Sequence, residues 1–125
     1  MKQKINPPKT RWWAFASIIT CSIFTSFGIL FWKIGAERIR NLSIASLLTN
    51  MPLIVGTLLY AIGAILLIVA LKGGELSVIQ PFISLSYVFI AIISVLILSE
   101  SLNTMKIAGM ASIIIGIIML GVGSR

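Results

Sequence analysis

Residues 76–99 read LSVIQPFISLSYVFIAIISVLILS, and this stretch decides the fold of the chain. It carries no charge, and it is longer than the roughly 20 apolar residues that a helix needs to cross the hydrocarbon core of a bilayer. Pro81 lies one turn in, directly after Gln80. We therefore predict that this stretch crosses a membrane as a helix.

One face of this predicted helix is polar. Small and polar residues recur at steps of three and four, which places them on one side of a helix; they are Ser77, Gln80, Ser84, Tyr87, Ala91 and Ser94. Such a stripe faces protein or a water-filled cavity. We expect Gln80, Ser84 and Tyr87 to line a substrate path, because glutamine is costlier to bury than serine. The alternative is packing alone, for which serine is ordinary between membrane helices.

The composition sets the class of protein. Of the 125 residues, 58% are hydrophobic and 10% are charged, whereas a soluble domain has about 25% charged residues. We predict a single-domain, all-α integral membrane protein. The chain has no histidine, and Cys21 is its one cysteine. This excludes an intramolecular disulfide, a Cys/His zinc site and Ser-His-Asp or Cys-His catalysis, so we expect neither an enzyme nor a metal or cofactor site.

The net charge of +7 raises the question of nucleic acid. However, the basic residues lie at the ends of apolar runs, where lipid head groups are found. We therefore expect the lipid bilayer, and not nucleic acid, as their partner.

Four apolar runs predict four spans. Trp12, Trp13 and Trp32 flank the first run, and such tryptophans anchor spans at membrane interfaces. The first connection is charged, with a short interfacial helix expected over 43–48, and Asn50 before Pro52 predicts a helix start capped by Asn50. We predict a basic tail over residues 1–11 that contacts anionic lipid, and a four-helix domain over 12–125 with spans at 12–32, 51–71, 76–99 and 107–122.

The other three spans carry faces of small residues. These faces are Ser17, Cys21, Thr25, Gly28 and Trp32 on the first span, Gly56, Tyr60 and Gly63 on the second, and Gly109, Ser112, Gly116, Met119 and Gly123 on the fourth. A small-residue face lets a neighbouring helix approach closely. For Cys21 and Thr25, lining a cavity remains an equal alternative.

Four spans place both termini on the same side of a cell membrane. Six of the ten Lys and Arg residues lie on that side and four on the other: Lys2, Lys4, Lys9, Arg11, Lys72 and Arg125 against Lys33, Arg38, Arg40 and Lys106. The excess favours a cytoplasmic tail. Because the bias is small, insertion in both orientations stays open.

Residues 75–121 resemble the last two helices of the drug/metabolite transporter superfamily. The resemblance rests on a small-residue third helix, on Glu100-Ser101-Leu102 and on a Gly-rich closing helix. Four spans match its smallest, small multidrug resistance-like or EamA-like members. The run PFISLSYV at residues 81–88 looks most like the small subunits of the aminoarabinose-phosphoundecaprenol flippase. Gly28 and Lys33 hold the Gly-x-x-x-x-Lys spacing of the first helix.

The chain departs from the small multidrug exporters in its ionisable groups. Their membrane-embedded glutamate corresponds to Thr25, their third-helix tyrosine to Gln80 and their tryptophan to Ile83, while Tyr60 matches a second-helix tyrosine. Proton-coupled export needs a group that changes charge inside the membrane, and no predicted span contains one. The departures argue against proton-driven cation export and agree with the flippase-like branch.

The resemblance therefore implies a transporter that translocates a polyprenyl-phosphate-linked sugar or similar amphipathic lipid. Lys33, at the mouth of a polar stripe, would meet the phosphate; a snorkelling anchor is the alternative. The alternatives in function are a small multidrug or metabolite exporter with non-standard coupling, and a non-transporting subunit of a membrane complex. The expected substrate-binding residues are Thr25, Lys33, Tyr60, Gln80, Ser84 and Tyr87.

The family's closing helix carries a dimer contact, and Gly109 and Gly116 match it, with Ser112 between them. The resemblance thus implies a homodimer, or a heterodimer with a second short homologue. Four helices alone also enclose little volume. The Met start, basic tail and short C-terminus favour a complete chain over half of a ten-span carrier.

Overall fold

The computed structural model describes residues 10–123, and within them it is all-helical, with no strand. Four segments are long and apolar enough to cross a membrane, which confirms the predicted fold class. Most of the predicted basic tail lies outside the described residues, and so do its expected lipid contacts. The helices are α1 Trp12–Glu37, α2 Ile44–Leu48, α3 Met51–Gly73, α4 Leu76–Phe82, α5 Leu85–Leu98 and α6 Thr104–Gly123.

Several helix ends differ from the sequence-based bounds. Helix α1 continues through Lys33 to Glu37, and α6 begins at Thr104, before Lys106. A helix need not end where its apolar run ends, because a lysine stem covers apolar surface while its charge reaches the head groups. As predicted, α3 begins with Asn50 at its N-cap position and Pro52 in its first turn. The expected side-chain cap bond is absent, and Asn50 Nδ2 instead donates to Gly35 O at 2.8 Å.

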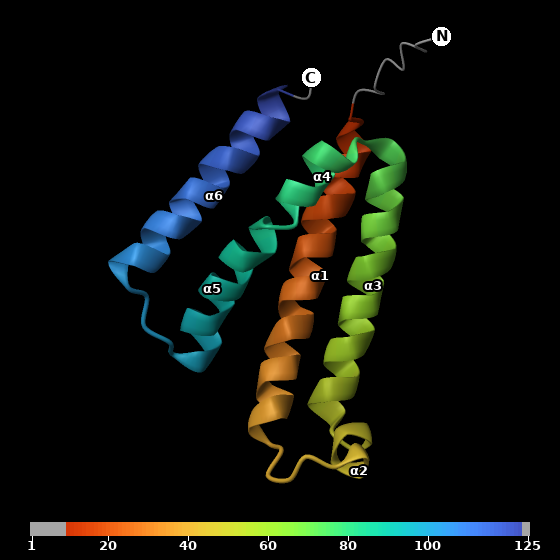
Figure 1. Ribbon diagram of the computed structural model, residues 1–125, viewed down its shortest axis with the longest axis vertical. Helices are drawn as coiled ribbons and strands as arrows, with labels where there is room; N and C mark the ends of the chain where they lie inside the picture. Colours follow the sequence, from red (N-terminus) through yellow and green to blue (C-terminus); the bar gives the residue numbers. More distant parts are fainter. Residues whose placement is uncertain (1–9, 124–125) are drawn as a thin grey trace.

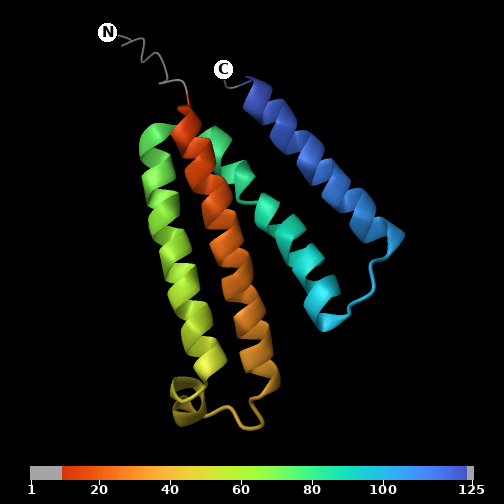
Figure 2. The same cartoon turned by 180° about the vertical axis from the view of Figure 1, so that it is seen from behind.

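The helices form a tight pair with a looser half beside it. Helices α1 and α3 run antiparallel and side by side over their whole length, as both views show (Figures 1 and 2). The α4–α5 segment packs on another face of α1, and α6 runs along the outer side of α4 and α5. Only Ile117 of α6 is buried, so α6 is weakly attached to the rest of the chain.

The α1–α3 pair is held by the two small-residue faces, which meet each other. A Cβ added at Gly28 would lie 3.0 Å from Gly56 O, and one at Gly56 would lie 2.7 Å from Gly28 O. The Cys21 thiol donates to Gly63 O at 3.1 Å. The two backbones therefore approach as closely as glycine permits, which is how membrane helices gain packing without a hydrophobic driving force.

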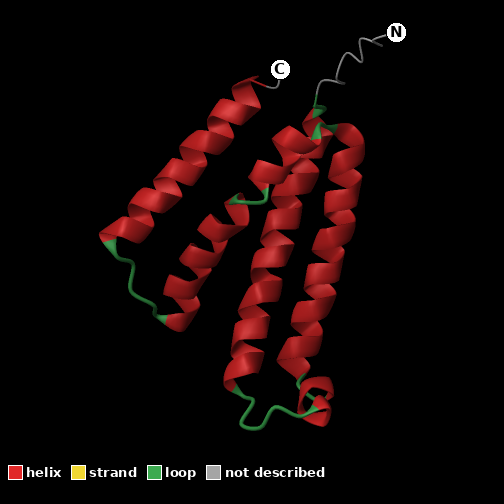
Figure 3. Ribbon diagram, in the orientation of Figure 1, coloured by secondary structure: helices red, strands yellow, loops and turns green. Residues whose placement is uncertain are grey.

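The stretch 76–99 was expected as a single helix, and the structure corrects this to two helices, α4 and α5. Figure 3 shows the loop between them. Proline has no N–H, and its ring clashes with the carbonyl one turn earlier. After Pro81 the backbone tightens, with Ser84 N–H donating to Pro81 O and Ser86 N–H to Ile83 O, both at 2.9 Å. The Phe82 carbonyl thereby loses its helical donor.

Two buried serines of α1 compensate for this break. The Ser22 hydroxyl lies 3.4 Å from Phe82 O, and the Ser26 hydroxyl donates to Ser86 O at 3.1 Å. Both side chains are 0% exposed, and each hydroxyl also reaches a carbonyl of its own helix. Buried carbonyls need such partners because none is available from lipid. These serines attach the broken span to α1.

Candidate functional site

The predicted polar stripe of α4 and α5 is divided: Ser94 lines a cleft against α1, whereas Gln80, Ser84 and Tyr87 lie outside the buried core. Gln80 is exposed, Tyr87 is 63% exposed, and Ser84 is half-buried. The side chains that α4 turns toward α1 are apolar, above all Ile79 and Phe82. Gln80 and Tyr87 make no side-chain hydrogen bond within residues 10–123. Gln80 and Tyr87 are therefore open at the surface of the single chain.

A crevice lies between the broken span and α6. It has a volume of about 140 Å³ and is lined by Pro81, Ser84, Ser112, Ile113, Gly116, Ile117 and Leu120. The break after Pro81 places Ser84 at its wall. The structure thus brings one residue of the expected substrate path together with Ser112 and Gly116 of the expected dimer seam.

Thr25 and Tyr60 lie elsewhere, at the contact of α1 with α3. The Thr25 hydroxyl donates to carbonyls of its own helix, Cys21 O at 2.9 Å and Ser22 O at 3.1 Å, and its methyl group faces Gly63. Tyr60 stacks on Trp32, with ring centroids 5.0 Å apart. Both residues lie where α1 contacts α3, which is a different face of α1 from the one that holds α4 and α5. The structure does not bring them to Gln80, Ser84 or Tyr87.

Lys33 forms an ion pair with Glu100, which follows α5. Ser99 adopts a left-handed conformation with φ 53°, and Glu100 N–H donates to Ser94 O at 3.3 Å. This turn presents the carboxylate to the last part of α1. The pair lies at the end of a narrow cleft of about 100 Å³ between α1 and α5, whose other polar lining residues are Ser26 and Ser94.

We expect this ion pair to contribute little to stability. The two side chains are 43% and 38% exposed, and exposed pairs contribute about 0.2–1 kcal/mol. A double-mutant cycle with Lys33→Ala and Glu100→Ala, measured by SDS unfolding in micelles, should give a coupling energy in that range. A coupling above about 2 kcal/mol would show that the pair is desolvated and acts as a structural lock.

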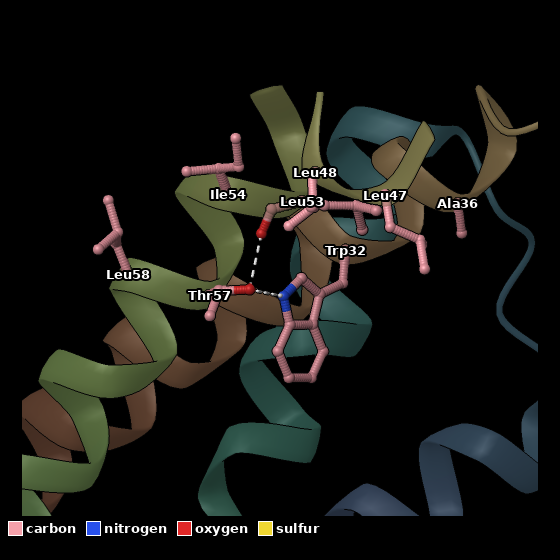
Figure 4. A pocket seen from close by; sticks show the side chains of 8 residues that line it. All are labelled: Trp32, Ala36, Leu47, Leu48, Leu53, Ile54, Thr57 and Leu58. Carbon is pink, nitrogen blue, oxygen red and sulfur yellow. Dashed lines mark hydrogen bonds between the residues drawn. The ribbon is translucent and has the colours of Figure 1, made fainter. Parts of the chain in front are cut away.

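A larger apolar groove borders Trp32 on the α3 side of α1 (Figure 4). Its volume is about 640 Å³, and it is lined by Trp32, Ala36, Leu47, Leu48, Leu53, Ile54, Thr57 and Leu58. Trp32 Nε1 donates to the Thr57 hydroxyl at 3.2 Å, which in turn donates to Leu53 O at 2.8 Å. The indole is therefore fixed as one wall. Sequence reasoning treated Trp32 mainly as an anchor and missed this groove.

The small residues of α6 differ from those of the α1–α3 pair. A Cβ added at Gly109 or Gly116 would meet no other atom within 4 Å. Gly116 borders the crevice, and Gly109 is exposed. The expected seam thus has room for a partner helix, and the dimer stays a prediction.

Sequence reasoning also missed Ser22, Ser26 and Ser86. Their signal was present: two serines four residues apart on one span, and a proline within another. A proline in a membrane helix frees carbonyls that neighbouring Ser or Thr side chains satisfy. That rule indicates a serine pair as the partner, but only the packing shows which helix supplies it.

Four apolar spans indicate a multi-pass membrane protein, and an interrupted span beside a crevice is a feature found in transporters. Residues 51–122 match the model of the EamA-like transporter family. The chain therefore belongs to the EamA-like transporter family, within the drug/metabolite superfamily. The match covers α3 to α6, so the whole broken span and the crevice lie inside it.

One relative is an uncharacterized protein of Methanocaldococcus jannaschii. It is 31% identical over 97 residues, which cover 78% of this chain and 71% of the relative. No solved structure matches the chain.

Proposed function

We propose that this transporter translocates a polyprenyl-phosphate-linked sugar or similar amphipathic lipid. In this proposal the polar head group passes along Gln80, Ser84 and Tyr87 while the lipid tail stays in the membrane. The observation that carries it is the break after Pro81, which opens Ser84 to the crevice beside α6. Irregular backbone at membrane depth occurs where it is buried or lines a cavity, and transporter sites lie at such interrupted helices.

The exposure of Gln80 supports this reading. Its amide has no hydrogen-bond partner in the part of the chain that the structure describes. An amide in a wholly apolar medium without partners costs roughly 4–8 kcal/mol. A polar head group, or a second copy of the chain, would remove that cost.

The apolar interiors of the spans support a lipid over a proton-coupled cation. No Asp, Glu, Lys or Arg lies between Trp12 and Trp32, within Met51–Leu71, or within Leu76–Ser99. A charge switch inside the membrane is therefore missing from these segments. Movement down a lipid gradient requires no such switch.

Lys33 is the proposed phosphate contact, and its pairing with Glu100 makes a sharp test possible. The measurement is the movement of a fluorescent polyprenyl-phosphate sugar across proteoliposomes, read by reagent access to each leaflet. Lys33→Ala should slow the movement about tenfold or more, because a hydrogen bond to a charged group contributes about 1.5–3 kcal/mol. Glu100→Gln frees Lys33 and should leave the rate unchanged or higher.

Both variants break the same ion pair, so structural damage alone would affect them equally. Full movement with Lys33→Ala would show that Lys33 does not bind phosphate. If the wild-type protein moves quaternary ammonium dyes and no lipid-linked sugar, export of small compounds replaces lipid translocation as its function.

A further inference from the structure

The connection between α1 and α3 builds a second polar and apolar surface, far along the chain from the crevice. Helix α2 starts at Ser43, whose hydroxyl accepts from Ser46 N–H at 3.2 Å, and Ser46 reciprocates in a capping box. Its leucines, Leu47 and Leu48, cover the groove beside Trp32, as Figure 4 shows. Ser46 and Thr49 instead border a different pocket. Helix α2 thus contributes to the lining of both the apolar groove and the polar pocket.

The polar pocket is basic. Its volume is about 440 Å³, and its lining residues are Arg38, Ile39, Arg40, Ser46, Thr49, Asn50, Met51 and Pro52. No carboxylate is among them. Neither guanidinium makes a hydrogen bond or an ion pair with any residue from 10 to 123. Both cations are therefore available to an anion.

The walls of this pocket are held in place. Asn50 Nδ2 donates to Gly35 O at 2.8 Å, which fastens the start of α3 to the last turns of α1. The Ser46 hydroxyl donates to Asn41 O at 2.8 Å, which fastens α2 to the loop that carries Arg40. These two bonds hold the backbone on either side of Arg38 and Arg40 against the start of α3 and against α2.

We propose that the basic pocket and the apolar groove together bind one anionic phospholipid. Its phosphate contacts Arg38 and Arg40, and one hydrocarbon chain lies in the groove against Trp32. Arginine is the preferred partner of phosphate because its planar fork forms two parallel hydrogen bonds. The groove volume lies within the 300–1,000 Å³ typical of small-molecule sites.

Charge and polarity select this occupant. A free anion would fill the basic pocket but leave the groove empty, whereas a neutral lipid would fill the groove and leave the arginines unpaired. The site is built by α1, α2 and α3 with Arg38, Arg40 and Trp32, whereas the proposed transport path uses Gln80, Ser84 and Tyr87 of the broken span and Lys33, which pairs with Glu100 on the α5 side. The inference therefore does not rest on the proposed function, and either can fail alone.

The test uses Trp32 as the reporter. In the full chain with Trp12→Phe and Trp13→Phe, Trp32 is the one remaining tryptophan. The protein is reconstituted in phosphatidylcholine vesicles that contain a minor fraction of phosphatidylglycerol with brominated chains. We expect this lipid to quench Trp32 more strongly than an equal fraction of brominated phosphatidylcholine.

The arginines provide the decisive variants. Arg38→Gln with Arg40→Gln should lower the apparent affinity for the brominated anionic lipid about tenfold or more, since each arginine near an anionic surface adds to binding. Lys72→Gln is the matched control, because it removes an exposed cation at the opposite end of α3 and should leave quenching unchanged. Quenching that is equal for both lipids, or equally weakened by Lys72→Gln, would overturn the proposal.

Two further measurements guard against indirect effects. In native mass spectrometry, the protein with its own three tryptophans should retain one bound anionic phospholipid, and the variant with Arg38→Gln and Arg40→Gln should lose it. Retention of the lipid by both proteins would contradict the proposal. Inorganic phosphate should not relieve the quenching. If it does, the basic pocket binds a free anion and the lipid assignment is wrong.

Discussion

Replacing Gly56 by valine is expected to force α1 and α3 apart and to give the largest loss of stability in this protein. A Cβ at this position would lie 2.7 Å from Gly28 O and 2.6 Å from Trp32 Cδ1. The carbonyl belongs to the backbone and cannot rotate away, so the helices must separate. Overpacking costs about 1–3 kcal/mol and sometimes more, and the γ-methyl groups of valine add to it.

Gly109→Val is the matched control, because a Cβ at Gly109 meets nothing within 4 Å. Both changes place a valine in the second turn of a membrane helix, in α3 for Gly56 and in α6 for Gly109. Measured on the monomer, where the predicted dimer seam makes no contact, unfolding by SDS in micelles should show a loss of about 3 kcal/mol or more for Gly56→Val and little change for Gly109→Val. Equal losses would mean that the effect comes from helix propensity and not from the α1–α3 contact.

The double change Ser22→Ala with Ser26→Ala is expected to loosen α4 and α5 from α1. Among residues 10–123, Phe82 O would lose its only side-chain donor, and Ser86 O would lose its hydrogen bond from Ser26. A buried polar group without a partner costs about 1–3 kcal/mol, although hydrogen bonds between membrane helices average about 0.6 kcal/mol. We therefore expect a combined loss of about 1–3 kcal/mol.

Hydrogen exchange distinguishes this local effect from general destabilisation. Amide protection should fall around residues 83–87 and stay nearly constant in α3. Thr20→Ala is the control, since the Thr20 hydroxyl is exposed and donates only to Ala16 O of its own helix at 2.9 Å. If Thr20→Ala lowers protection at the break as much as the double change does, the two serines do not hold the broken span.

These two predictions concern contacts that differ in how readily the sequence reveals them. The small-residue faces were predicted from spacing alone, because a helix places steps of three and four on one side. Consecutive spans are antiparallel neighbours, and small-residue faces allow the closest approach, so contact between the faces of α1 and α3 is the expected packing. The serine contacts were not predicted, since Ser22 and Ser26 become important only when Pro81 has broken the facing helix.

The candidate site was predicted less completely than the fold. Gln80, Ser84 and Tyr87 were predicted to share one face; the structure leaves Gln80 and Tyr87 exposed and places Ser84 in the crevice beside α6. Lys33 was expected at the mouth of a polar stripe, and its pairing with Glu100 depends on the turn at Ser99, which spacing does not reveal. The basic pocket beside α2 was not anticipated at all.

The sequence by itself determined that this is an all-α, four-span membrane protein, because the length and apolarity of each run are local properties measured against the thickness of a bilayer. The tertiary structure decided which face of each helix is buried, where the third span breaks and which cations are free. Those outcomes depend on pairs of distant residues. The serines of α1 satisfy carbonyls freed by Pro81, and Glu100 neutralises Lys33, while Arg38 and Arg40 are left without a partner among residues 10–123.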